Sequence, residues 1–380
     1  RLQVMNTMLP PVPKSLGRLS EVFLSAYQSV VGEVNQLGLK KTNTAIVVLV
    51  DGLGVSNLSG AGGHAPFLNS SDRSTLSIDT VFPSTTSAAI TSFATGVMPG
   101  AHGTVGYQIF DHVAQQGLNL LTGQTAEQAL ARQTTQTITE RAQANSIPTY
   151  FIGPPGYENS GFTNATMRGA KYLAGKSFGD RVDHCSDLMK SNEPKLIYCY
   201  FPELDQNAHA HGTKSRKWTE KLEDLDAVMK DLHTRAGNRA GVVVTADHGI
   251  VDVAHDKHIF LDDLESQLDG LKFVGGDPRV SFLYFENATS AAIAAEALQV
   301  ALGKVAYVLT KQQMIDSGLY GELSDKFMND LPEVFVLAKT EVAFYHRKFA
   351  KTKSMQMVGQ HGSISPAELK VPLIRLGAYA

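Results

Sequence analysis

The chain has 380 residues, of which 43% are hydrophobic, and a formal net charge of −3 at pH 7. This length and apolar content predict one large domain with an insertion, or two domains. Because the charge is nearly balanced and no block of lysine and arginine stands out, we expect no nucleic-acid polymer as the main partner. No apolar run approaches the roughly 18 residues of a membrane span, so we expect no transmembrane segment.

The chain contains two cysteines, Cys185 and Cys199, and the second lies within an apolar run at residues 196–201. Such a pair provides no disulfide framework, which favours a reducing compartment. We therefore expect a cytoplasmic location. A secreted protein stays open as an alternative, because the sequence begins at Arg1 and a leader could have been removed.

The first elements predict a helix near residues 19–27 and then a strand over residues 44–50. That strand is a continuous β-branched run, typical of a strand buried on both faces, and it ends in Asp51-Gly-Leu-Gly54. An acid at the carboxyl end of a buried parallel strand lies where α/β sheets place their sites. A dinucleotide-binding fingerprint is disfavoured, because the third glycine is replaced by Asn57.

A cluster of hydroxyl side chains then precedes a predicted helix. Pro83 and Ser84 supply the stop and cap signals, and a mostly apolar helix runs to Gly96. The N-terminus of a helix can hold an anion such as phosphate, and the hydroxyls of Thr85 and Thr86 are placed to attack it. The alternative is that the cluster only caps the helix.

The middle of the chain predicts a helix from Thr125 onward, a strand over residues 148–153 and a loop over residues 161–169. Residues 175–179 fit the G-x-S-x-G pattern of a nucleophilic serine. That pattern requires a preceding buried strand, and residues 168–174 do not predict one, so we reject this hypothesis.

Two further buried strands are predicted at residues 195–201 and 241–246, separated by a core helix over residues 215–236. Asp205 and His209 follow the first strand at a spacing that puts both on one side of a helical turn. Asp247 and His248 follow the second. Carboxylates gathered at one sheet edge would repel each other unless cations lie between them, and mixed Asp and His ligands suit zinc or a similar metal. Two clusters indicate two ions, as in phosphoryl transfer.

Residues 251–357 predict a compact α+β insertion, with strands at 279–285, 305–309 and 334–338 and a helix at 290–302. We therefore divide the chain into a core of residues 1–250 and 358–380 and a cap of residues 251–357. His361, between two glycines where the chain returns, is a candidate last ligand. His255 and His258 are expected in a solvated loop.

Taken together, these residues make the sequence resemble the type I phosphodiesterase and nucleotide pyrophosphatase branch of the alkaline phosphatase superfamily. The resemblance implies an α/β fold whose mostly parallel central sheet is flanked by helices and carries the small α+β cap. It also implies a covalent phosphothreonine mechanism with two divalent ions, most simply Zn²⁺, with Mn²⁺ or iron as alternatives. The nucleophile would be Thr86, ten residues before Gly96. The first implied ligand set is Asp51, Asp247, His248 and the Thr86 oxygen; the second is Asp205, His209 and His361.

Two departures from the family pattern concern the substrate. The Pro-Asn-His of the family is here Ala88-Ala89-Ile90, and the asparagine that supports a phosphoryl oxygen is here Tyr107. We name Tyr107 and Arg168 as candidate substrate-binding residues. Because no other arginine or lysine lies beside the ligands, we expect a small phosphodiester or nucleotide pyrophosphate rather than a dianionic monoester. The alternatives are a phosphomonoesterase, a phosphonate hydrolase of the same superfamily, or a non-catalytic metal-binding module.

Overall fold

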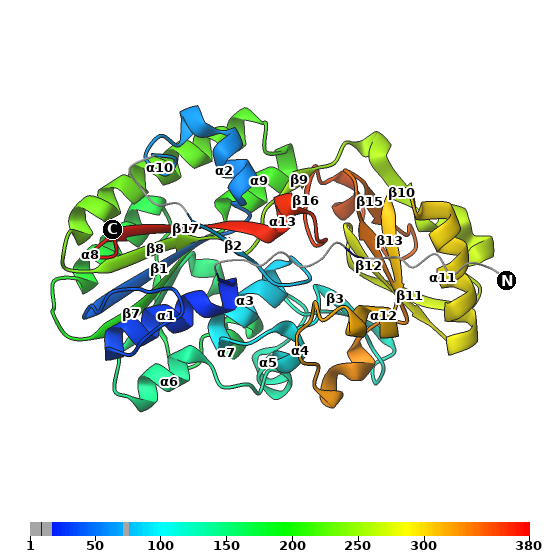
Figure 1. Ribbon diagram of the computed structural model, residues 1–380, viewed down its shortest axis with the longest axis horizontal. Coiled ribbons are helices and arrows are strands. Elements are labelled where there is room, and N and C mark those ends of the chain that lie inside the picture. Colours follow the sequence, from blue (N-terminus) through cyan, green and yellow to red (C-terminus); the bar gives the residue numbers. More distant parts are fainter. Residues whose placement is uncertain (1–8, 10–16, 71–75) are drawn as a thin grey trace.

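Figure 1 shows the computed structural model, which describes residue 9 and residues 17–70 and 76–380. The start of the predicted core, residues 1–8 and 10–16, and residues 71–75 lie outside the described residues. The centre of the molecule is a seven-stranded sheet in the order β2-β17-β8-β1-β7-β5-β6. Its strands are β1 (Thr44–Val50), β2 (Leu76–Asp79), β5 (Thr149–Gly153), β6 (Lys171–Ala174), β7 (Lys195–Phe201), β8 (Gly241–Thr245) and β17 (Lys370–Gly377).

The sheet is mostly parallel. Strand β1 pairs in parallel with both β7 and β8, and β5 pairs in parallel with β6 and β7, whereas β17 runs antiparallel to β8 and β2. Every residue of β1, β7 and β8 is buried, which explains their near-continuous apolar sequences. The predicted α/β fold class is therefore confirmed, and these central strands match their predicted positions within one residue.

Helices cover both faces of this sheet (Figure 1). One face carries α1 (Leu19–Val31), α3 (Thr86–Thr95) and α6 (Ile138–Ala144), and the other carries α8 (Phe178–Leu188) and α10 (Arg216–Ala236). Phe23 of α1 stacks on Phe93 of α3 with ring centroids 4.7 Å apart, and Phe93 in turn contacts Tyr198 of β7 at 5.1 Å. These aromatic contacts fix α3 against the centre of the sheet.

A smaller antiparallel sheet lies beside the first, in the order β11-β12-β14-β13. Its strands are β11 (Leu271–Asp277), β12 (Val280–Phe285), β13 (Ala306–Thr310) and β14 (Val334–Ala338), and α11 (Ala288–Leu302) packs on one face. The other face shares a hydrophobic cluster with Phe82, Val105 and Ile109 from the part of the chain before the predicted cap. The division at residues 250 and 358 stays a prediction, but the small sheet clearly packs on residues outside it.

Short elements complete the described chain. They are α2 (Val55–Gly60), α4 (Pro99–His102), β3 (Gln108–Asp111), β4 (Gln116–Asn119), α5 (Ala126–Arg132), α7 (Gly161–Thr166), α9 (Glu203–His211), β9 (Val251–Asp252), β10 (His258–Phe260), α12 (Lys311–Asp316), β15 (Ala343–Tyr345), β16 (Gly359–Gln360) and α13 (Pro366–Leu369), with 3₁₀ turns at Gly62–His64, Pro155–Tyr157, His255–Lys257, Leu261–Gln267, Asp325–Asp330 and Ser354–Gln356. Among the described residues, no helix combines the length and apolar character needed to cross a membrane.

Several local predictions are wrong. The segment predicted as a loop contains α7, because the Ser160 side chain caps its first turn. The helix expected from Thr125 is two helices, each with its own capping box. Residues 171–174 do form a strand, β6, but at the edge of the sheet, and Ser177 caps α8. His258 begins β10, which pairs with β15, instead of lying in a loop.

Candidate active site

The carboxyl ends of three adjacent strands bring three aspartates together. Asp51 directly follows β1, Asp247 lies two residues beyond β8, and Asp205 lies in the first turn of α9 beyond β7. The N–H of Gly52 donates to Asp247 Oδ1 at 3.1 Å and joins the ends of β1 and β8. Gly52 has φ = +74°, a conformation that favours glycine, so the residue after Asp51 is constrained by the turn.

Three histidines meet these carboxylates. His248 Nε2 lies 3.4 Å from Asp51 and 3.5 Å from Asp247. Asp205 is approached by His209 Nε2 at 3.3 Å and by His361 Nε2 at 3.9 Å. The rings of His248 and His361 stack with centroids 3.7 Å apart. The structure therefore brings together all six Asp and His side chains that the sequence predicts as ligands.

Backbone carbonyls orient the histidine rings. Nδ1 lies 2.9 Å from the carbonyl of Ser84 in His361, 2.7 Å from that of Gly359 in His209, and 3.2 Å from that of Gly249 in His248. A carbonyl oxygen only accepts, so each Nδ1 carries a hydrogen. In the neutral rings Nε2 then has a free lone pair, whereas the protonated His209 ring donates from Nε2 to Asp205. Histidines that bind metals are held in the same way by their second nitrogen.

Burial sets the electrostatics of the cluster. Burial, followed by the charge of Asp247, raises the pKa of Asp51 well above its usual value, and burial with Asp205 raises the pKa of Asp247 to about 6. Burial also lowers the pKa of His248 to about 4 and that of His361 to about 3. Burial acts to lower the pKa of His209, but Asp205 outweighs it and raises the value to about 9. Asp51 and Asp247 therefore oppose their own ionisation, whereas His209 outweighs the effect of burial and lowers the pKa of Asp205 below its usual value.

Several carboxylate oxygens in this cluster lack a hydrogen-bond partner. Oδ1 of Asp51, Oδ1 of Asp205 and Oδ2 of Asp247 are buried and accept no hydrogen bond from the described residues. Buried carboxylate oxygens of this kind are costly unless a cation or a donor satisfies them. Two groups have ligand atoms within 4.8 Å of one another, namely Asp51 with Asp247 and His248, and Asp205 with His248 and His361. The donor set fits divalent metals of the zinc type. His248 belongs to both groups, whereas the sequence assigned it to the first alone.

Thr86 is the first residue of α3, and its Oγ1 lies 3.2 Å from His248 Nε2. The loop before it is tied to the His361 loop, because the Ser84 hydroxyl donates to the Ser363 carbonyl and accepts from the Gly362 N–H. Thr85 is the N-cap residue, but its side chain makes no capping hydrogen bond. A simple helix cap therefore does not account for the two threonines.

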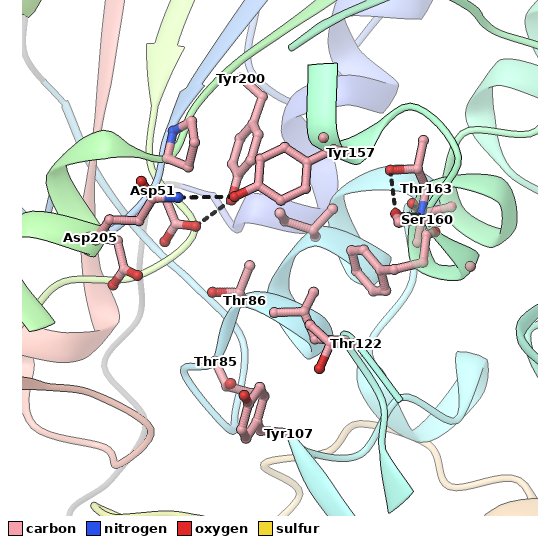
Figure 2. Close-up of a pocket in the computed structure, with 18 of the residues that line it drawn as sticks. Asp51, Thr85, Thr86, Tyr107, Thr122, Tyr157, Ser160, Thr163, Tyr200 and Asp205 are labelled. Carbon is pink, nitrogen blue, oxygen red and sulfur yellow. Dashed lines mark hydrogen bonds between the residues drawn. The ribbon is translucent and has the colours of Figure 1, made fainter. Parts of the chain in front are cut away.

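A cavity of about 660 Å³ opens over the cluster, and Figure 2 shows part of its lining. Asp51, Thr86 and Asp205 line it together with Thr85 and Tyr107, and the substrate role of Tyr107 stays a prediction. Arg168 does not line the cavity. Its guanidinium pairs with Glu140 at 2.8 Å and donates to the carbonyls of Gln133, Thr135 and Ala165. The structure therefore assigns Arg168 to the protein framework and does not support a role in substrate binding.

Sequence reasoning missed three residues of the site. The Tyr200 hydroxyl donates to Asp51 Oδ2, and the Tyr157 ring meets Tyr200 edge to face at 5.9 Å. Asp277, at the end of β11, enters the cavity wall from the small sheet. The alternation of Tyr198 and Tyr200 in a buried strand could have indicated that both face one side. Nothing local to Asp277 indicates its position.

Comparison with known proteins identifies the family. The sequence matches the model of the family described as type I phosphodiesterase / nucleotide pyrophosphatase over residues 45–364. The chain therefore belongs to this family of hydrolases, which is metal-dependent, as the sequence predicts. An uncharacterised pyrophosphatase/phosphodiesterase of Schizosaccharomyces pombe is 23% identical over 58% of this chain and 48% of its own length. Venom phosphodiesterase 2 of Crotalus adamanteus is 24% identical over 60% of this chain and 27% of its own length. The alignments thus cover less than half of either relative.

Two solved structures share the fold. Inactive murine ectonucleotide pyrophosphatase/phosphodiesterase 5 in complex with AMP superposes with a TM-score of 0.67, 17% identity and 88% coverage of both chains. Phosphonoacetate hydrolase of Sinorhizobium meliloti, in complex with phosphonoformate, superposes with a TM-score of 0.68 and 15% identity, covering 87% of this chain and 89% of that one. These similarities confirm the predicted fold.

Proposed function

We propose that the protein hydrolyses small phosphodiesters or nucleotide pyrophosphates through a phosphothreonine formed at Thr86. The observation that carries this proposal is the position of the Thr86 hydroxyl, 3.2 Å from His248, where the two Asp/His groups meet at one end of the cavity. Family membership and the AMP complex of the murine neighbour support it. AMP is a small phosphoester, the broad class of partner that we expected for this chain, but as a monoester it does not bear on the preference for diesters.

The residues that would hold the metals are those predicted from the sequence. Asp51, Asp247 and His248, with the Thr86 oxygen, would hold one ion, and Asp205, His209 and His361 would hold the other. We assign both as zinc, with Mn²⁺ and iron as alternatives that the same donors accept. When bound, such ions lower the pKa of hydroxyl groups and stabilise negative charge on the attacking and leaving oxygens.

The chain itself supplies the nucleophile and the setting for two displacement steps. The Thr86 oxygen loses its proton and forms a bond to phosphorus, while the bond between phosphorus and the leaving oxygen breaks and that oxygen takes up a proton. Water then adds to phosphorus, and the bond to Thr86 breaks to restore the hydroxyl. Backbone N–H groups in the first turn of α3 would hold a phosphoryl oxygen. We place Tyr107 at the substrate as a hydrogen-bond donor and an aromatic surface.

The charge of the cavity supports the diester preference. Among the described residues that line it, none is lysine or arginine, and two of the acids are Asp51 and Asp205. A phosphate monoester carries about one more negative charge than a diester at neutral pH. Apart from the metals, no cationic side chain of the described lining would neutralise that additional charge.

The test is a comparison of kcat/KM on bis-aryl phosphate, mono-aryl phosphate and aryl sulfate under identical metal loading. The proposal predicts the highest value on the bis-aryl phosphate. A clear preference for the monoester would contradict it and identify a phosphatase. Activity on none of the three, with metals bound, would favour a non-catalytic metal-binding module.

A further inference from the structure

Asp277 is a carboxylate in the cavity wall that neither the metal groups nor the proposed displacement uses. It follows Gly276, which has φ = +79°, and precedes Pro278, so the backbone fixes its direction. Its Cβ lies 3.0 Å from the point where a Cβ on Gly362 would stand, which places it against the loop that carries His361. It therefore faces the reaction region from the small sheet.

The carboxyl group is incompletely satisfied. Asp277 Oδ2 is inaccessible to water and has no hydrogen-bond partner among the described residues. Burial raises the pKa of Asp277 to about 7, against the lowering effect of the neighbouring Thr85. A buried carboxylate oxygen without a donor makes ionisation of Asp277 costly, and a positive charge beside the carboxylate would offset that cost.

The surroundings of Asp277 favour a cation over an anion. It lines the main cavity, whose described lining includes no lysine or arginine, and an adjoining hollow of about 330 Å³. Lys351 and Lys353 line that hollow, but both are exposed, so water and salt screen their charge. Tyr107, which lines both spaces, adds an aromatic ring that tolerates a nearby cation.

We propose that Asp277 is a specificity-determining residue that selects phosphodiesters in which one ester group carries a primary ammonium. The N–H of that ammonium donates to the Asp277 carboxylate, which lines the cavity, and the positive charge pairs with it. The same carboxylate repels the additional negative charge of a monoester. This inference rests on the proposed function and names the chemical class of its substrate.

The experiment uses three 4-nitrophenyl phosphodiesters whose second ester group is 2-aminoethyl, 2-hydroxyethyl or ethyl, together with 4-nitrophenyl phosphate. For the wild-type protein we expect kcat/KM to be about tenfold higher on the aminoethyl ester than on the ethyl ester, as for a charge-assisted hydrogen bond. The hydroxyethyl ester should lie between them, because it donates without a charge. In Asp277→Asn the aminoethyl preference should fall to about twofold or less, while activity on the monoester should rise.

In the variant, the aminoethyl preference should fall while activity on the monoester rises. Damage to the fold would instead lower the activity on every substrate. Asp277→Ser provides a second variant with the same expected signs. Asp269→Asn is the matched control, because Asp269 is an exposed acid of the same part of the chain and should leave every ratio unchanged. Calorimetric binding of the aminoethyl and ethyl esters to Thr86→Ala should show the same preference without turnover.

A wild-type protein that hydrolyses the ethyl ester without any preference for the aminoethyl ester would overturn the role of Asp277 and leave the proposed function standing. An aminoethyl preference that survives in both Asp277 variants would also overturn it. Hydrolysis of none of the diesters by the metal-loaded protein would overturn the proposed function itself and this inference with it.

Discussion

The Oγ1 atom of Thr86 lies 3.2 Å from Nε2 of His248, and this contact joins the start of α3 to the two Asp/His groups. Nδ1 of His248 faces the Gly249 carbonyl, so Nε2 carries no hydrogen and the threonine hydroxyl donates to it. The candidate nucleophile thus points at the one histidine that belongs to both Asp/His groups. The proposed chemistry depends on this arrangement more than on any other.

Metal content is the first prediction. Protein purified without chelators should contain about two divalent ions per chain, because two Asp/His groups with unpaired oxygens are present. Chelation should abolish diesterase activity, and zinc should restore it. Elemental analysis that finds one ion, or none in a protein that turns over diesters, would contradict the two-metal proposal.

Proton release should accompany metal binding. His209 has a raised pKa of about 9 in the metal-free protein, so its Nε2 holds a proton at pH 7.5 that a metal must displace. Asp247, with a pKa of about 6, and Asp51, whose pKa is also raised, bind further competing protons as the pH falls, so zinc affinity should drop. His248 and His361 have lowered pKa values of about 4 and about 3, so both are already neutral at pH 6 and above and should release no protons there. Calorimetry in buffers of different ionisation enthalpy measures the protons released; a value near zero at pH 7.5 would count against this account.

Tyr200 should tune metal affinity. Its hydroxyl donates to Asp51 Oδ2, so Tyr200→Phe leaves that buried oxygen without a donor. We expect zinc affinity to fall by about 10- to 100-fold, as for other residues that orient metal ligands. Competition with a chromogenic chelator measures the change. Tyr172→Phe is the control, since the Tyr172 hydroxyl donates to the Pro154 carbonyl; an equal effect in both variants would argue against a specific role for Tyr200.

Arg168 should affect stability and not substrate binding. Arg168→Gln removes the ion pair with Glu140 and leaves backbone carbonyls without their charged donor. The free energy of unfolding should fall by about 1 to 3 kcal/mol, measured by urea denaturation. KM for a diester should stay within about twofold. A large rise in KM with unchanged stability would restore the role that the sequence suggested.

The parts of the fold that could be predicted are those that follow from local sequence patterns. Residues 44–50 and 195–201 are buried on both faces, so their apolar runs identified β1 and β7 to the residue. The shared position of Asp51, Asp205 and Asp247 followed because parallel strands end at the same sheet edge. The helix at residues 161–166 depended on a single capping serine and was missed.

The remainder of the site depends on contacts between distant segments. Asp277 reaches the cavity because β11 belongs to a sheet that packs on residues 82–120, a relationship with no local pattern. Arg168 was predicted as the only basic side chain that could reach the ligands, but its ion pair with Glu140 holds it in the protein framework. The carbonyls of Ser84 and Gly359 that orient His361 and His209 are likewise visible only in the folded chain.

The central claim is that Thr86 attacks phosphorus beside the metals, and the most direct measurement compares Thr86→Ala with wild type for metal content and for turnover of bis-aryl phosphate. We expect the variant to keep at least one of the two ions, since the Asp and His ligands remain, and to lose at least about 1,000-fold in kcat. Mass analysis of acid-quenched wild-type protein should show one phosphoryl ester on Thr86, absent from the variant. Near wild-type turnover by Thr86→Ala would contradict the account.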